Sequence, residues 1–327
     1  MKNVIKWGIM GPGLIAHKFV KGLLTIEDTK IIAVGSRDKI RAESFSKQYG
    51  IEKSYGSYQE LVSDPDIDII YVATPHPFHK DCVKLCLNAG KAVLCEKPFT
   101  LNAKDTRELV VLAKEKKLFL MEAMWTRFLP AIKKTRKWLQ EGAIGEVQML
   151  KADFGFGGEH DPKGRILNLE LGGGALLDLG IYPVSFASMV YGTQPEIIKS
   201  LADIGPTGVD EKCAMLFGYD NGKMASLHVS FKMDLINNAW IFGTNGNIII
   251  DNFINPSGAT LTLSNGQKET FKALDQYSGY QFEALEAIDC IRKGKIESDI
   301  MPLDESIAIM ETMDILRAQW QLRYPGE

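Results

Sequence analysis

The sequence has few cysteines, little net charge and no long uninterrupted apolar run. Its 327 residues include five cysteines and carry a formal net charge of −3. So few cysteines, odd in number, favour no disulfide framework, and we expect buried thiols. The balanced charge, without a basic stripe, points to neither nucleic acid nor an anionic membrane. No apolar run reaches the roughly 18 residues of a membrane span.

Two further absences bear on location and metal binding. The first apolar segment begins almost at residue 1, which leaves no room for a signal peptide, so we expect a cytoplasmic protein. Cys82 and Cys86 lie four apart on a predicted helix, which could seed a metal site. No His or Cys pair with ligand spacing accompanies them, and we therefore predict no metal.

The chain is longer than one hydrophobic core usually supports, so we expect two domains. Over residues 1–122, short apolar segments alternate with segments of helical periodicity. This rhythm predicts an α/β fold with a doubly wound parallel sheet, a Rossmann domain. The expected strands are 4–10, 31–34, 67–73, 92–95 and 118–121, and the expected helices are 14–24, 39–49, 78–88 and 102–116.

Residues 123–327 have a different pattern and are predicted to form an α/β domain for substrate binding and dimerisation. Alternating segments predict a large, mostly antiparallel sheet, with Asn-Gly hairpin turns at 221–222, 245–246 and 265–266. We expect helices 174–191, 280–293 and 304–323 to cover one face of this sheet. The expected strands are 147–154, 196–204, 212–219, 223–231, 239–243, 247–251, 260–264 and 269–272.

Helices on one side leave the other face of this sheet open. The alternation over residues 224–231 assigns each side chain to one of two faces. We expect this open face to pair with a second copy of the chain. The open side should hold Met224, Ser226, His228 and Ser230, and the covered side should hold Ala225, Leu227, Val229 and Phe231.

The most informative motif is Gly-Pro-Gly-Leu-Ile-Ala at 11–16, between the first strand and the first helix. Gly11 permits a tight turn, Gly13 lets the backbone approach a pyrophosphate, and Ala16 takes the place of a third glycine. The helix N-terminus, with Leu14 and Ile15, then attracts the diphosphate charge. The alternative is an ordinary glycine turn.

The ends of the next two strands complete the predicted dinucleotide site. Ser36 and Arg37 offer a hydroxyl and a guanidinium suited to a 2′-phosphate, which favours NADP over NAD. The nearby Asp38 keeps NAD possible, and Arg37 could instead be a solvated loop charge. After the third strand, we expect a turn beneath the nicotinamide ribose, with Thr74, Pro75, His76 and His79 as cofactor contacts.

A lysine follows the fourth strand, in Cys-Glu-Lys-Pro at 95–98. The fold places substrates outside the carboxyl ends of such strands. Pro98 restrains the backbone at Lys97, and we expect both Glu96 and Lys97 to contact the cofactor. A lysine beside the nicotinamide can donate to a carbonyl oxygen or lower the pKa of a neighbouring phenol. The alternative is an exposed surface lysine.

Three glycines at 172–174 precede an apolar run that contains Asp178 and Tyr182. On a regular helix, residues four apart share a face. Pro183 disfavours helical geometry at Tyr182, so we expect a break or kink there. Asp178 needs a partner if it is buried, and the glycines let the backbone approach something closely. The alternative is a capping aspartate and a core tyrosine.

Taken together, these motifs resemble the Gfo/Idh/MocA oxidoreductase family over essentially the full length. They include the glycine turn, Cys-Glu-Lys-Pro, Met-Glu-Ala-Met-Trp-Thr-Arg-Phe at 121–128, and Gly-Gly-Gly-Ala-Leu-Leu-Asp-Leu-Gly-Ile-Tyr at 172–182. The resemblance implies that Lys97 and Tyr182 are the catalytic pair and that Asp178 orients them. It also implies that Trp125, Arg127 and Phe128 line the cleft near nicotinamide and substrate.

The resemblance further implies the reaction. Tyr182 would accept the proton of a substrate hydroxyl while hydride passes to the nicotinamide, with Lys97 stabilising the oxyanion and no metal required. We expect an NADP-dependent oxidoreductase, with NAD possible, acting on an aldose or a cyclic trans-dihydrodiol. The alternatives are a reductase of a dicarbonyl or an anhydro- or deoxy-keto sugar, and a regulatory protein that senses the cofactor without turnover.

Overall fold

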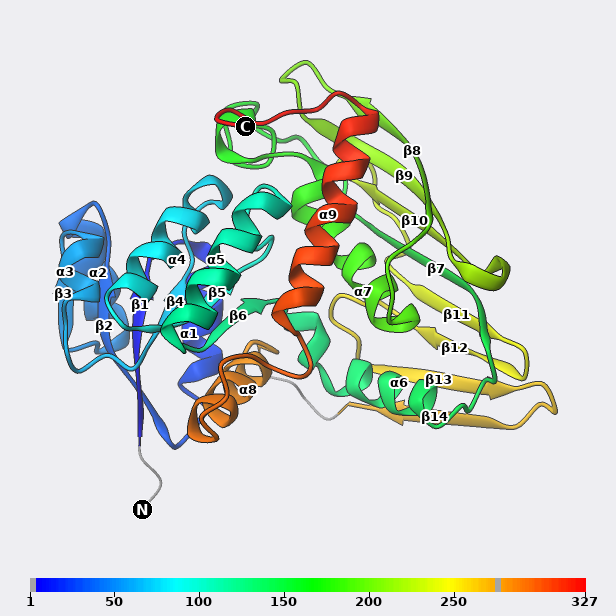
Figure 1. Cartoon of the computed structure of the whole chain (residues 1–327), viewed down its shortest axis with the longest axis horizontal. Helices are drawn as coiled ribbons and strands as arrows, with labels where there is room; N and C mark the ends of the chain where they lie inside the picture. Colours follow the sequence, from blue (N-terminus) through cyan, green and yellow to red (C-terminus); the bar gives the residue numbers. More distant parts are fainter. Residues whose placement is uncertain (1–3, 274–277) are drawn as a thin grey trace. The chain divides into compact units, whose positions relative to one another are not determined.

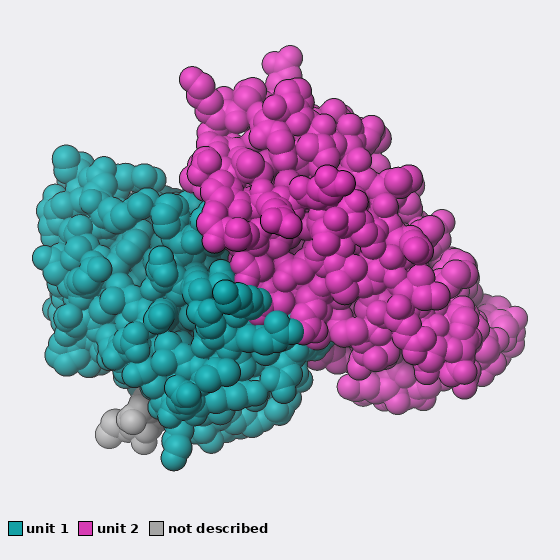
Figure 2. Space-filling model, turned by 45° about the horizontal axis from the view of Figure 1, so that its top comes forward, with its two compact units in different colours: residues 1–100, 104–125, 277–307 teal, residues 101–103, 126–276, 308–327 magenta. Residues whose placement is uncertain are grey.

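The computed structural model describes residues 4–273 and 278–327, which form two compact units (Figure 2). The first unit contains residues 1–100, 104–125 and 277–307, and the second contains 101–103, 126–276 and 308–327. The chain therefore returns to the first unit after it has built most of the second. A boundary near residue 122 describes the first crossing but not this return.

The first unit is built on a parallel sheet of six strands in the order β3-β2-β1-β4-β5-β6 (Figure 1). This confirms the predicted doubly wound fold, and it places a topological switch point between β1 and β4. The short β3 was not predicted, because three half-buried residues give no periodicity. The strands are β1 (Ile5–Met10), β2 (Thr29–Gly35), β3 (Lys53–Tyr55), β4 (Ile69–Val72), β5 (Ala92–Glu96) and β6 (Leu120–Ala123).

The helices of the first unit include α8, which the sequence analysis placed on the other sheet. That expectation is wrong, because α8 belongs to the first unit and packs against α1. The close approach depends on Gly22, where a Cβ would lie 2.9 Å from the amide nitrogen of Gln281. The helices are α1 (Leu14–Leu23), α2 (Lys39–Tyr49), α3 (Tyr58–Val62), α4 (His79–Asn88), α5 (Ala103–Lys116) and α8 (Gln281–Arg292).

The second unit contains a sheet of eight strands in the order β14-β13-β12-β11-β7-β10-β9-β8 (Figure 1). All the predicted strands are present, but they do not form a simple meander. β7 inserts between β11 and β10 and pairs with β10 in parallel. The strands are β7 (Val147–Gly155), β8 (Ile197–Ile204), β9 (Asp210–Gly218), β10 (Met224–Ser230), β11 (Ala239–Gly243), β12 (Gly246–Ile250), β13 (Gly258–Leu263) and β14 (Lys268–Lys272).

One face of this sheet is covered by α6 (Pro130–Gln140), which packs on β13 and β14, and by α7 (Ile181–Tyr191), which packs on β7 and β10. The last helix, α9 (Leu303–Gln319), reaches the β8 edge, where Gln319 donates to the carbonyl of Ile198. The stretch 169–191 does reach the length and apolarity of a membrane span, contrary to expectation. In its most apolar window of 18 residues, 89% is buried, as in the core helix of a folded domain.

The other face of the sheet carries exposed side chains on β8, β9, β10 and β11. Along β10, Met224 and His228 are exposed while Ala225, Leu227 and Val229 are buried, which confirms the predicted alternation. Ser230 is the exception: it is buried at the end of the strand, where its hydroxyl accepts from the amide of Lys232. The five cysteines are buried and free, as predicted.

Candidate active site

The turn after β1 has the geometry that a dinucleotide phosphate needs. Gly11 adopts a φ of +91°, a conformation that favours glycine, and a Cβ there would lie 3.2 Å from the carbonyl oxygen of Ala73. Gly13 precedes α1, and no side chain caps the amides of that helix. Uncapped amides at the positive end of a ten-residue helix can accept an anion. The residues present therefore fit the diphosphate of a dinucleotide.

The first residues of α1 also fit a bound cofactor. Leu14 is an apolar side chain that is 88% exposed directly after Gly13, and Ile15 is half-buried. A dinucleotide bound at the glycine turn would lie next to both side chains. Leu14 and Ile15 thus lie where the sequence analysis placed cofactor contacts.

The end of β2 presents a hydroxyl and a guanidinium rather than a free carboxylate. Asp38 is the N-cap of α2, and its carboxylate accepts from the amides of Ile40 and Arg41 at 2.9 and 3.3 Å. Ser36 is buried and its hydroxyl accepts from the Asp38 amide. Arg37 is exposed, and its guanidinium lies 4.8 Å from the centre of the Phe78 ring.

The His79 ring fixes the backbone of the turn after β4. The ring nitrogens of His79 lie 2.8 Å from the carbonyl oxygen of Thr74 and 2.9 Å from that of Pro98. The ring is fully buried, and burial lowers the pKa of His79. His79 therefore links the turn to the segment that follows Lys97. Within the turn, Thr74 and His76 are buried and Pro75 is half-buried.

Lys97 follows the last residue of β5 and is half-buried. The preceding Glu96 is buried, and its carboxylate accepts from the Tyr71 hydroxyl on β4 and from the Lys97 amide. Glu283 on α8 lies near Glu96, and burial, together with the Glu96 charge, raises the pKa of Glu283 well above its usual value. Two hydrogen bonds therefore hold the Glu96 carboxylate directly before the candidate catalytic lysine.

Trp125 and Tyr280 stack in the first unit. Their ring centres are 4.7 Å apart and the planes differ by 18°. Tyr280 directly precedes α8, so the return of the chain to this unit supplies the partner of Trp125. Sequence reasoning selected Trp125 and missed Tyr280, because the two lie 155 positions apart without any local motif.

Arg127 and Phe128 are enclosed in the second unit. Nε of Arg127 donates to the Ser185 hydroxyl at 3.0 Å, and a terminal nitrogen donates to the Ser185 carbonyl at 2.7 Å. Phe128 is completely buried. These contacts give Arg127 a structural role, since it anchors α7 one turn beyond Tyr182.

Asp178 and Tyr182 lie on consecutive turns of one irregular helix. Residues 176–180 form a π-helical turn that runs directly into α7. The break expected at Tyr182 is not present, because Tyr182 and Pro183 both lie inside α7; the irregularity is the π turn before them. Such π turns often mark functional sites. Asp178 is 7% exposed and accepts from Arg165 at 2.9 Å, and the Tyr182 ring meets Phe154 edge-on at 5.7 Å.

Arg165 is the residue of this group that the sequence analysis missed. It belongs to the long segment between β7 and the three glycines, which carries no recognisable motif. The glycines explain its position. A Cβ at Gly173 would lie 2.6 and 2.8 Å from the carbonyl oxygens of Ile166 and Arg165. What the glycine backbone approaches closely is thus the chain's own Arg165 segment.

Lys97 belongs to the first unit, and Asp178 and Tyr182 belong to the second. Within the described ranges, 4–273 and 278–327, no group of three or more His, Cys, Asp or Glu side chains could hold a metal ion. The fold, the glycine turn and the lysine at a strand end together define a nicotinamide-type dinucleotide enzyme.

The chain belongs to the Gfo/Idh/MocA oxidoreductase family. Residues 5–124 match the family model described as an oxidoreductase family with an NAD-binding Rossmann fold, and residues 132–249 match the Gfo/Idh/MocA C-terminal domain. It is an NAD(P)-binding oxidoreductase. This confirms the class predicted from the motifs.

Among its relatives are the trans-1,2-dihydrobenzene-1,2-diol dehydrogenases of Mus musculus and Homo sapiens. They are 40% and 38% identical to this chain, each over 99% of both sequences. A 3-ketoreductase from Actinomadura kijaniata, solved with NADP and TDP-benzene, is 25% identical, with a TM-score of 0.86 over 97% of this chain and 98% of that one. Levoglucosan dehydrogenase, 17% identical with a TM-score of 0.88 over 96% of each chain, shares the fold.

Proposed function

We propose that this protein is an NADP-dependent dehydrogenase that moves hydride between the nicotinamide and a hydroxyl-bearing carbon of a small polyhydroxylated compound. The substrate would be a cyclic trans-dihydrodiol or an aldose. One observation carries the proposal: the chain is 40% identical, over 99% of both sequences, to a trans-1,2-dihydrobenzene-1,2-diol dehydrogenase. The stated substrate of that relative is a vicinal diol on a ring.

The preference for NADP is supported by the charges at the end of β2. A carboxylate that binds the ribose 2′-hydroxyl would repel a 2′-phosphate. The Asp38 carboxylate is instead engaged by the amides of α2, and the exposed guanidinium of Arg37 is the adjacent charge. A guanidinium can bind phosphate through two parallel hydrogen bonds. The 25% identical 3-ketoreductase was solved with NADP.

The proposed mechanism assigns one task to each of three side chains. The nicotinamide, when bound, supplies or accepts the hydride. Tyr182 takes the proton from the substrate hydroxyl during oxidation and returns it during reduction. The ammonium of Lys97 favours the tyrosinate and stabilises negative charge on the substrate oxygen, so the mechanism uses no metal. Asp178, held by Arg165, keeps the orientation of Tyr182 or of the substrate.

The reverse direction is a second candidate, which one relative favours. The Actinomadura kijaniata protein is a 3-ketoreductase, and the match to this chain covers 98% of its length. The same tyrosine and lysine would then protonate and polarise the carbonyl of a keto sugar. Rates in both directions, at matched cofactor concentration, separate the two candidates.

We further propose that the open face of the large sheet pairs with a second copy of the chain. Five large apolar side chains on four of its strands are between 37% and 79% exposed. Exposed apolar patches of this kind mark interaction surfaces. A sheet pairing with itself across a two-fold axis presents the same residues on both sides. The five exposed apolar side chains are Ile197, Leu201, Leu216, Met224 and Phe242.

The experiment that tests the catalytic assignment compares Tyr182→Phe and Lys97→Met with the wild-type protein. A positioned acid–base group contributes about 10²- to 10⁴-fold. Both variants should therefore lose about that factor in kcat, while calorimetry shows nearly unchanged NADP binding. Wild-type turnover in both would refute the assignment. Tyr191→Phe is the control, because Tyr191 ends the same helix as Tyr182 and its hydroxyl donates to the carbonyl of Met224.

A further inference from the structure

Glycines 172–174, called the glycine joint below, connect the Arg165 segment to the π turn and are packed against other residues on two sides. On one side, the amide of Gly174 donates to the carbonyl of Ile166 at 2.9 Å. On the other side, a Cβ at Gly174 would lie 2.4 Å from Oδ1 of Asp210, and Gly174 has a φ of +117°. The joint leads directly into the π turn and α7. Asp178 and Tyr182 therefore follow the packed glycines directly along the chain.

Asp210, the first residue of β9, closes the buried side of this joint. Its Oδ2 accepts from the amide of Leu176 at 2.6 Å, at the start of the helix that carries both candidate site residues. Asp210 is completely buried, and its Oδ1 has no hydrogen-bond partner within the described part of the chain. A carboxylate at this end of a helix is favoured by the helix dipole.

The C-terminal segment closes the joint a second time. Tyr324 is buried, and its hydroxyl donates to the carbonyl of Gly173 at 2.6 Å. The Arg317 guanidinium, on α9, lies 5.1 Å from the centre of the Tyr324 ring and binds both carboxylate oxygens of Glu327. The Tyr324 amide donates to the same carboxylate. The end of the chain is thus clamped onto α9 with Tyr324 directed at the glycines.

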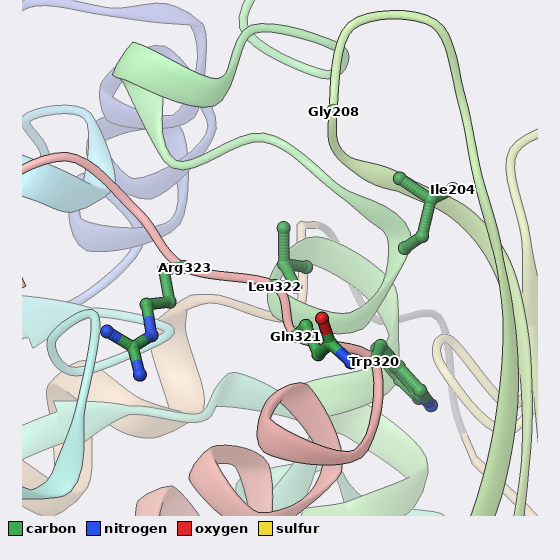
Figure 3. A pocket seen from close by; sticks show the side chains of 6 residues that line it. All are labelled: Ile204, Gly208, Trp320, Gln321, Leu322 and Arg323. Atoms are coloured by element: carbon green, nitrogen blue, oxygen red, sulfur yellow. The ribbon is translucent and has the colours of Figure 1, made fainter.

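The residues that connect α9 to Tyr324 are themselves seated in the second unit. Trp320, Leu322 and Arg323 line an open hollow together with Ile204 at the end of β8 and Gly208 in the loop before Asp210 (Figure 3). The segment and the start of β9 therefore lie side by side. Two separate parts of the chain, the start of β9 and the C-terminal segment, contact the same glycines.

We propose that Asp210 and Tyr324 are positioning residues for the reaction, and that they fix the direction in which Asp178 and Tyr182 point. This proposal rests on the proposed function, in which Tyr182 is the group that transfers the proton. Neither side chain is required to touch substrate. Nothing in the local sequence around Asp210 or Tyr324 indicates this role.

The proposal has a pH signature. Burial raises the pKa of Asp210 to about 7, and the Arg317 guanidinium and the Leu176 amide oppose this rise. The other titratable groups that face Asp210 are Tyr324 on the C-terminal segment and Cys213 on its own strand. Below about pH 7, a neutral acid replaces the anion at the helix start and weakens its hold on the Leu176 amide.

The test measures kcat and KM from pH 5.5 to 8.5 for the wild type, Asp210→Asn and Tyr324→Phe. Asparagine resembles the protonated aspartate in shape and charge. We expect Asp210→Asn to lose about 10- to 100-fold in kcat at high pH and to converge on the wild type at low pH. Tyr324→Phe should lose a similar factor at every pH. NADP binding should be unchanged in both variants.

Asn102→Ala is the matched control. It removes a hydrogen bond to Glu327 and so loosens the same terminal segment without touching the joint. Its kcat should stay at the wild-type value even where its melting temperature falls. The positioning role is overturned if Asp210→Asn keeps a constant ratio to the wild type across pH, or if Tyr324→Phe changes only the melting temperature. Wild-type turnover of Tyr182→Phe would instead overturn the proposed function.

Discussion

Replacement of Asp210 by asparagine should change the pH dependence of stability by a predictable amount. The carboxylate is completely buried, and burial raises its pKa from 3.8 to about 7. In the unfolded chain, the same group titrates at its usual value. Between these two values, the folded protein holds a proton that the unfolded chain has lost. The free energy of unfolding therefore falls as the pH rises through this window and levels off above about pH 7.

The magnitude follows from the size of the shift. One pKa unit corresponds to about 1.36 kcal/mol, so a shift of roughly three units corresponds to about 4 kcal/mol over the whole window. From about pH 5 to about pH 8, the wild type should lose about 3 kcal/mol from this group. Asparagine does not titrate. The free energy of unfolding of Asp210→Asn, relative to the wild type, should therefore rise by that amount.

Urea unfolding at a series of pH values measures this difference directly. Asp203→Asn serves as the control, because Asp203 is only half-buried and its ion pair with Lys232 lowers the pKa of that carboxyl. The stability difference of Asp203→Asn should stay constant from about pH 5 to about pH 8, since Asp203 is ionised in both states there. A constant difference for Asp210→Asn as well would refute the assignment of a buried, proton-binding carboxylate.

Three further predictions concern the surface and the cofactor site. Arg37→Ala should raise the KM for NADP by about 10- to 100-fold and leave the KM for NAD nearly unchanged. Initial rates with each cofactor measure this, and equal changes in the two KM values would contradict a contact between Arg37 and the 2′-phosphate. Asp38→Ala should destabilise the protein by about 1 kcal/mol through loss of the α2 cap, and denaturation that is unchanged would contradict this. Leu201→Glu, on the open face, should yield monomers in light scattering. Val111→Glu is the control, because Val111 is exposed on α5, and it should not change the mass. Identical masses for the two variants would exclude the open face as the interface.

Much of the fold could be predicted because its signals are local. The strands β11 and β14 and the helix α2 lie within a residue of their predicted bounds, since alternation and turn dipeptides lie inside the segments themselves. The errors involve long-range contacts. The packing of α8 on α1 depends on a glycine more than 250 positions earlier in the chain, at Gly22. The parallel pairing of β7 with β10 depends on two strands that are separated by β8 and β9.

The candidate site divides in the same way. Gly11, Lys97 and Tyr182 could be selected because each belongs to a motif with its own chemistry. Arg165 and Asp210 could not, because each acts through a contact with a distant segment and is surrounded by ordinary loop or strand residues. The glycines at 172–174 indicated a close approach, but only the structure shows that the Arg165 segment and Asp210 are what they approach.

The proposed function is the oxidation of a hydroxyl-bearing substrate with NADP. The most direct measurement follows NADPH absorbance with the wild-type protein, NADP or NAD, and a panel of cyclic trans-dihydrodiols and aldoses. We expect turnover with at least one member of the panel, and faster turnover with NADP than with NAD at equal concentration. NADP binding without turnover on the whole panel, in either direction, would contradict it.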